Sequence, residues 1–161
     1  KGSSGVAALI RPVLEEAGFP RDRLADAAFL EGVAGLIQER VKVLSEVPDM
    51  VRYLFEGPAA YAAEDLVPKK SDPARTAGML EAMKPFVAFA AEAGTEAAVF
   101  DARARTLAET QGVKLGDLLM PLRVAVTGSK VSPPLHDSIR LIGADRALAA
   151  VDAAIAKLRG A

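Results

Sequence analysis

Residues 120–137 decide how this sequence is interpreted. They read Met120-Pro121-Leu122-Arg123-Val124-Ala125-Val126-Thr127-Gly128-Ser129-Lys130-Val131-Ser132-Pro133-Pro134-Leu135-His136-Asp137. An apolar run ends at Thr127-Gly128, a turn with two consecutive prolines follows, and a second apolar run begins at Leu135. Apolar residues at helical spacing predict helices, and a glycine directly after such a run is a typical helix stop. The stretch therefore predicts two helices joined by a turn.

The composition is that of a globular helical protein. Of the 161 residues, 51% are hydrophobic and 25% are charged, which excludes a disordered chain. Aromatic residues make up only 5%, and alanine supplies much of the apolar fraction, which favours closely packed helices. No uncharged apolar run is long enough to span a membrane. Because the chain has no cysteine, disulfides and thiolate metal sites are excluded.

The helical pattern extends along the whole chain. We predict an all-α fold with about eight helices in two packed lobes. Residues 1–5 have the composition of a cloning scar or a linker. Residues 6–56 are expected to form the first lobe, and residues 74–161 the second lobe, which carries the 120–137 turn. Residues 57–73 contain several prolines and are expected to form the connecting loop, with little to bury.

Glycine and proline set most of the expected helix boundaries. The expected helices are 6–17, 22–30, 34–44, 48–56, 74–93, 96–111, 116–127, 134–142 and 144–158. Gly32 and Gly35 weaken the pattern between the second and third of these helices. Pro85 is expected to kink or break a helix near Met83, and Pro121 to interrupt another. Thr95 has the position and chemistry of a helix N-cap.

The sequence offers little for catalysis. It contains neither a phosphate-binding P-loop nor a glycine-rich dinucleotide fingerprint. One histidine and no cysteine cannot build a Cys–His pair or a histidine-rich metal site. The acidic residues fall mostly on polar helix faces, where they are ordinarily solvated. We therefore expect no catalytic residue, metal site or cofactor in this chain.

A few residues are candidates for ligand binding, each with a structural alternative. Arg123 sits in an apolar segment, so it either pairs with a carboxylate or faces outward towards a ligand. His136 could stack on a nucleobase, or it is an exposed first-turn residue. The turn at Ser132–Pro134 either reads a splayed base or is an ordinary helix connection. Arg40 lies on a polar helix face. The net charge of −1 weighs against a general nucleic-acid coat.

Several segments, in order, resemble the anticodon-binding region of bacterial glutamyl-tRNA synthetase. The most specific is Pro121-Leu122-Arg123-Val124-Ala125-Val126-Thr127-Gly128, which is similar to the P-L-R-x-A-x-T-G signature of that family. The weaker matches are residues 9–18, 36–44, 53–55, 112–116 and 141–143, together with Arg146. Together they cover nearly the whole chain after residue 5.

The resemblance implies a helical cage that binds the anticodon loop of tRNA(Glu), for glutamate attachment in translation. The family is a class I ligase whose H-I-G-H-like and K-M-S-K-S-like motifs lie in an N-terminal catalytic domain that uses ATP and Mg. Neither motif is present here. We therefore expect this chain to be non-catalytic alone, cytoplasmic, and partnered by tRNA(Glu) and that catalytic domain. The competing hypotheses are a helical protein-interaction module and, least favoured, a free-standing enzyme.

The resemblance also implies which residues contact the anticodon. Carried over position by position, they are Arg123, Ser132, Pro133, Leu135 and His136, with Arg40 as the candidate for reading the third anticodon base. The family often has P-G-L-F at the turn, whereas this chain has Pro134 and His136 in place of the glycine and the phenylalanine. Pro134 allows the backbone of the turn fewer conformations than a glycine would. His136 places a polar ring where the family has an apolar one.

Overall fold

A computed structural model describes residues 3–38, 44–69, 71–92, 94–130 and 132–160, and within these ranges every regular element is helical. The α-helices are α1 (Ser3–Glu16), α2 (Arg21–Leu24), α3 (Ala27–Ile37), α4 (Val47–Glu56), α5 (Pro73–Ala90), α6 (Ala97–Gln111), α7 (Leu115–Thr127), α8 (Leu135–Ile142) and α9 (Ala144–Leu158). Two short 3-10 helices, η1 (Leu44–Glu46) and η2 (Ala63–Leu66), precede α4 and α5. The predicted all-α class is confirmed.

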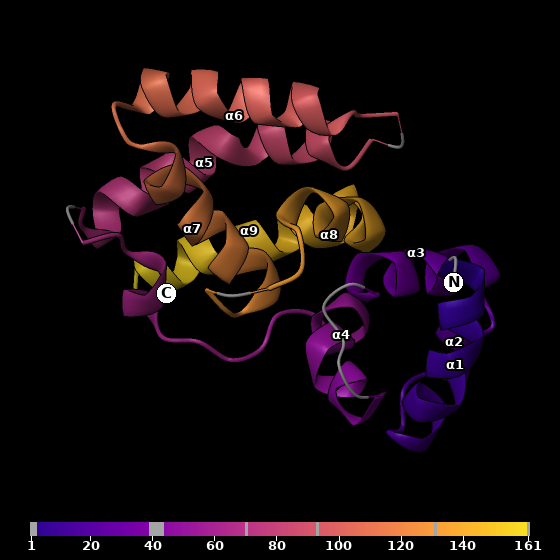
Figure 1. The fold of residues 1–161 in the computed structure, drawn as a ribbon. Coiled ribbons are helices and arrows are strands. Elements are labelled where there is room, and N and C mark those ends of the chain that lie inside the picture. Colours follow the sequence, from indigo (N-terminus) through magenta and orange to yellow (C-terminus); the bar gives the residue numbers. More distant parts are fainter. Residues whose placement is uncertain (1–2, 39–43, 70, 93, 131, 161) are drawn as a thin grey trace.

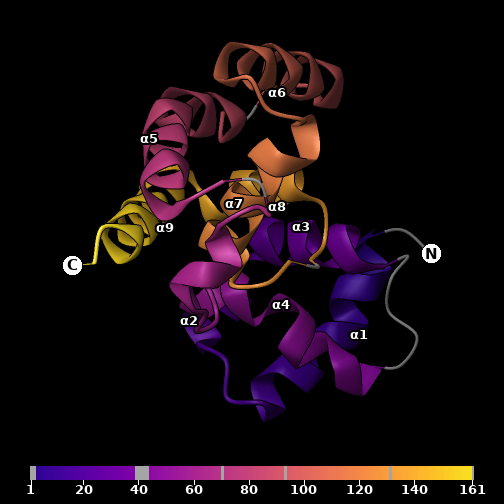
Figure 2. The same ribbon diagram turned by 90° about the vertical axis from the view of Figure 1, so that its left-hand side faces the viewer.

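The helices form two groups in space. Figures 1 and 2 show α1–α4 gathered at one end of the molecule and α6 at the other, with α5, α7 and α9 beneath α6. The buried side chains divide in the same way. One cluster runs from Ala7 to Phe55, and the other from Leu66 to Leu158. Leu141 and Ile142 of α8 also pack against the first cluster, so α8 joins the two groups.

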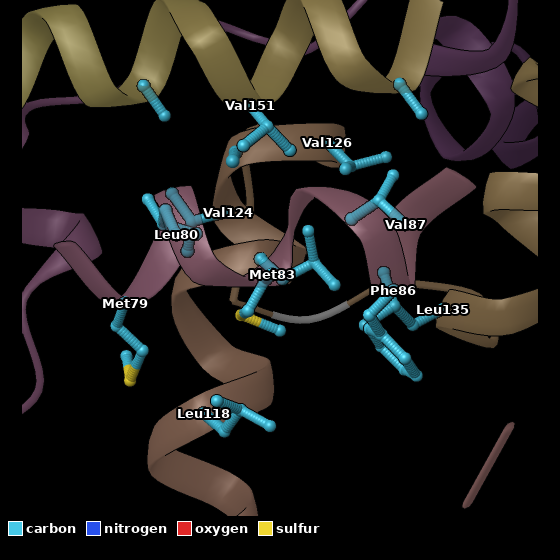
Figure 3. Packing of buried hydrophobic residues seen from close by; sticks show 14 of the residues in the cluster. Met79, Leu80, Met83, Phe86, Val87, Leu118, Val124, Val126, Leu135 and Val151 are labelled. Atoms are coloured by element: carbon cyan, nitrogen blue, oxygen red, sulfur yellow. The ribbon is translucent and has the colours of Figure 1, made fainter. Parts of the chain in front are cut away.

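The second cluster takes its side chains from η2 and from helices α5 to α9. Figure 3 shows the side chains of Leu80 and Met83 on α5 close to Val124 and Leu118 on α7, with Val151 of α9 nearby. All five side chains are at most 1% exposed. This buried core fixes α7, and therefore the position of the turn at its end.

Neither of the two prolines expected to disturb a helix breaks it, and the kink considered for Pro85 stays a prediction. Pro85 lies inside α5 and Pro121 inside α7, and both helices continue through them. An internal proline removes one hydrogen bond and costs about 3 kcal/mol. The buried residues on both sides of Pro121, including Leu118 and Leu122, keep α7 packed in the core. Burial of that size offsets the cost, since one fully buried Leu is worth about 1.5–3 kcal/mol.

Helix α3 also differs from expectation, because it runs unbroken through Gly32 and Gly35. Its N-cap is Asp26, whose Oδ1 accepts a hydrogen bond from Phe29 N at 3.1 Å. A Cβ at Gly32 would lie 2.4 Å from Leu141 Cδ2, so glycine allows α8 to approach α3 closely. The glycine therefore serves the packing of α3 against α8. The segment expected to form a helix from Asp22 is only the four-residue α2.

Three further expectations change at the ends of helices. Thr95 is not the N-cap of α6: that position is Glu96, and Thr95 Oγ1 donates to Phe89 O at 2.8 Å. The first helix, expected to begin at residue 6, begins at Ser3, and the assignment of residues 1–5 to a cloning scar or a linker stays a prediction. Within 57–73, η2 buries Leu66 completely, so this connection is anchored to the second cluster. The end of the expected 34–44 helix includes residues 39–43, which lie outside the described residues.

Candidate functional site

The turn after α7 begins at a locally determined helix stop. Gly128 has φ 80°, a left-handed conformation that glycine adopts without strain. Thr127 Oγ1 donates to Arg123 O at 2.8 Å and accepts from Ser129 N at 3.1 Å. The Thr-Gly pair of the signature therefore ends the helix and directs the chain into the turn.

Gly128 also brings the turn against the segment that follows α4. A Cβ at this position would lie 2.4 Å from both the nitrogen and the oxygen of Ala59. Ala59 N donates to Thr127 O at 3.3 Å. Only a residue without a side chain fits between these backbones, so the turn and residues 57–59 form one unit.

Arg123 holds the far side of the turn. Its Nη1 donates to Ser132 Oγ at 2.6 Å and to Pro133 O at 3.2 Å. Ser132 Oγ in turn donates to Pro133 O at 2.8 Å. The structure thus brings three of the predicted site residues together. Arg123 fixes the backbone carbonyl of Pro133, which is a role that neither alternative considered from the sequence had anticipated.

A cavity of about 740 Å³ lies beside this turn. Thr127, Ser129, Ser132 and Pro133 line one side of it, and α4 with residues 57–59 lines the other. The volume falls within the range of about 300–1,000 Å³ that is typical of small-molecule pockets. The turn singled out by the sequence therefore faces an open space large enough for one nucleobase.

Hydrogen bonds between segments far apart in the chain hold the two walls of the cavity in position relative to each other. Tyr53 OH lies 2.6 Å from Ser138 Oγ, and Ser138 Oγ donates to Pro134 O at 2.8 Å. Because the serine hydrogen is committed to Pro134, Tyr53 is the donor in its bond to Ser138. Arg146 Nη2 also donates to Phe55 O at 3.0 Å. Helices α8 and α9 are thereby tied to α4.

Leu135 and His136 do not line this cavity. Leu135 is 4% exposed and belongs to the second cluster. The His136 side chain is 8% exposed and stacks on Phe100, with ring centroids 4.5 Å apart and planes at 9°. The alternative of an exposed first-turn histidine is therefore wrong. Contact of either residue with a bound base stays a prediction.

The surroundings of the His136 ring disfavour its charged form. Burial lowers its pKa from the usual value, and the Asp137 carboxylate opposes this shift without cancelling it. Its Nε2 atom is buried without a hydrogen-bond partner within the described part of the chain. A charged imidazole at this position would be costly, so the ring acts as a packing element between α8 and α6.

Arg40 lies outside the described residues, so its placement relative to the cavity stays open to experiment. The residues of α4 that line the cavity were missed from the sequence, where α4 was interpreted only as a buried stripe. A signal was available, because Asp49, Arg52 and Glu56 follow one another at spacings of three and four and so share one helix face.

Within the described ranges, no group of three or more histidine, cysteine, aspartate or glutamate residues could hold a metal ion. No helix in the same ranges has the length and apolar character needed to cross a membrane.

Comparison with known proteins identifies the family of this chain. A family model described as an anticodon binding domain matches residues 6–155. The glutamate–tRNA ligase of Treponema denticola is 42% identical over 129 residues, covering 78% of this chain and 24% of that protein. The glutamate–tRNA ligase of Herpetosiphon aurantiacus is 32% identical over 154 residues, covering 94% of this chain and 31% of that protein.

The fold matches a solved structure as well. The crystal structure of a glutamate tRNA ligase from Elizabethkingia meningosepticum, in complex with its amino acid, superposes with a TM-score of 0.77 at 19% identity. The match covers 98% of this chain and 30% of that one. The chain therefore spans 24–31% of the length of these relatives. On these matches the chain belongs to the anticodon-binding domain family, in the form found in glutamate–tRNA ligases.

Proposed function

We propose that this chain binds the anticodon loop of tRNA(Glu) at the cavity between α4 and the α7–α8 turn. The observation that carries the proposal is the bonding of Arg123 to Ser132 and Pro133, which presents a fixed backbone at the edge of the cavity. Sequence-specific RNA binding usually takes unstacked loop bases and reads their edges through a few hydrogen bonds. A hydrogen-bonded turn beside a cavity that can hold a nucleobase fits this mode of recognition.

The charge of the chain supports base reading over general phosphate binding. Its net charge is −1, and phosphate contacts normally require a surplus of lysine and arginine. Base contacts specify a sequence, whereas phosphate contacts position the nucleic acid. We infer that other parts of a longer enzyme supply most of the phosphate contacts.

The remaining parts of the proposal concern that longer enzyme. Glutamate activation, with ATP and Mg, belongs to a catalytic domain that this chain does not contain, and the complete ligase works in the cytoplasm. Pyrophosphate exchange with glutamate, ATP and tRNA tests this division. The isolated chain should give no exchange above a control without enzyme, and exchange above that level would contradict it.

The binding proposal is tested by titrating the chain into a fluorescent tRNA(Glu) anticodon stem-loop. Saturable binding that weakens when the anticodon bases are replaced supports the proposal. Binding that is equal for unrelated anticodons would show that the cavity does not read bases.

A further inference from the structure

The cavity has a second side that the family resemblance does not assign to tRNA contact. We call it the α4 wall, and it consists of Glu46, Asp49, Arg52, Tyr53 and Glu56, which all line the cavity. It comes from the first group of helices, whereas the turn comes from the second. A base that enters from the turn side would face the α4 wall.

The α4 wall carries net negative charge. It holds three carboxylates, Glu46, Asp49 and Glu56, against the single guanidinium of Arg52. Arg52 lies 3.1 Å from Glu56 Oε2 and 3.6 Å from Asp49 Oδ1, so its charge is already shared between two carboxylates. Among the described residues, those that line the cavity from the turn are Thr127, Ser129, Ser132 and Pro133, and none of these four has a charged side chain. The described lining of the cavity is therefore more acidic than basic, which disfavours a phosphate group beside it.

These carboxylates are accessible, and the fold does not depend on them. The side chains of Asp49 and Glu56 are 92% and 50% exposed. Exposed ion pairs at this helical spacing contribute little to stability. Glu56 is also the last residue of α4, where a negative charge opposes the helix dipole. The ion pair with Arg52 is the benefit that the helix gains from Glu56, and the half-exposed carboxylate remains accessible to a ligand.

The chemistry of these groups selects one kind of base edge. Ionised carboxylates only accept hydrogen bonds, so they pair with N–H donors. Cytosine and adenine present an exocyclic amino group, and a carboxylate that accepts from cytosine N4 is a known form of base recognition. Uracil presents a carbonyl at the equivalent position, which would place one acceptor against another.

We propose that the α4 wall is a specificity element of the cavity, at which the carboxylate of Asp49 or of Glu56 accepts a hydrogen bond from the amino group of one anticodon-loop base. This proposal rests on the anticodon-binding function proposed above. The turn wall holds the base through backbone groups, and the α4 wall discriminates amino-bearing bases from carbonyl-bearing ones.

The test uses the full 161-residue chain and pairs of anticodon stem-loops that differ in one atom group. In each pair, one loop base is changed from amino to carbonyl, as cytosine to uracil or adenine to hypoxanthine. Dissociation constants are measured for the unsubstituted chain, for Asp49→Asn, for Glu56→Gln and for the double variant. Glu109→Gln, an exposed position on α6, is the matched control. Circular dichroism checks that every variant is folded.

At one loop position, the unsubstituted chain and the control should bind the stem-loop with the amino-bearing base at least about fivefold more tightly than its carbonyl-bearing partner. This ratio is the low end for one good contact to a base edge. The double variant should lose or reverse this preference, because an amide can donate to the uracil carbonyl. An unchanged preference in the double variant would overturn the proposal. Equal tightening of all stem-loops would also overturn it, since that result indicates relief of phosphate repulsion. If the unsubstituted chain binds no stem-loop, the anticodon-binding function itself fails.

Discussion

Gly128→Ala should destabilise the chain far more than the same substitution at Gly112. Both glycines end helices in the left-handed region, with φ 80° and φ 68°. A residue with a side chain pays about 1–2 kcal/mol in that conformation. At Gly112 an added Cβ meets nothing within 4 Å, whereas at Gly128 it would lie 2.4 Å from the backbone of Ala59. Moving a packed backbone costs about another 1–3 kcal/mol.

The expected losses are therefore about 1–2 kcal/mol for Gly112→Ala and about 2–5 kcal/mol for Gly128→Ala. The reduced entropy of the unfolded chain is the same for both variants and cancels in the comparison. Urea unfolding followed by circular dichroism measures both values. If the two variants lose equal stability, within about 0.5 kcal/mol, then the close approach of the turn to Ala59 is not a determinant of the site.

Three further changes probe the site and its supports. Arg123→Ala should lower the free energy of unfolding by about 1–2 kcal/mol and should weaken stem-loop binding. This loss is at the low end for hydrogen bonds from a charged group, because the side chain is partly exposed. Arg123→Lys should restore stability only in part. Unchanged melting and unchanged affinity for Arg123→Ala would contradict its role in the turn. Burial lowers the folded pKa of His136, so stability should be full above its unfolded pKa of about 6.5 and decrease as the pH falls from there through the folded pKa. His136→Phe should remove that part of the pH dependence, and a profile identical to that of the unsubstituted chain would count against it. Tyr53→Phe should lower the free energy of unfolding in urea by about 1 kcal/mol, because the hydrogen bond to Ser138 is lost. Tyr61→Phe is the control. Equal effects of the two variants would be evidence against the link between the cavity walls.

The elements that sequence alone predicted well are those with strong local signals. Helices α4, α8 and α9 were expected within one or two residues of their observed bounds, because each has a clear apolar face and a proline or glycine at its boundary. The same holds for the stop at Gly128. These features depend on residues close together in the chain.

The errors arise where tertiary packing overrides local preference. Gly32 was treated as a weak point in a helix, but it accommodates Leu141, which is more than a hundred positions away. Pro121 stays helical because its flanks are buried, and His136 is buried by Phe100 of α6. None of these contacts can be identified from spacing along the chain.

The candidate site divides in the same way. The family resemblance selected Arg123, Ser132 and Pro133, and the structure places these three together. The α4 wall was missed because the contacts that bring α4 opposite the turn join residues far apart in the chain. Tyr53 and Ser138, for example, are 85 positions apart. Its charge becomes informative only once the cavity is known.

The central claim is that this cavity reads anticodon bases. The most direct measurement compares the affinity of the chain for two stem-loops that share a stem and loop length, one with the tRNA(Glu) anticodon and one with all three anticodon bases replaced. Base reading predicts at least about tenfold tighter binding of the first, which corresponds to about 1.4 kcal/mol. It also predicts that Arg123→Ala reduces this ratio. Equal affinities for the two stem-loops, or a ratio that Arg123→Ala leaves unchanged, would contradict the claim.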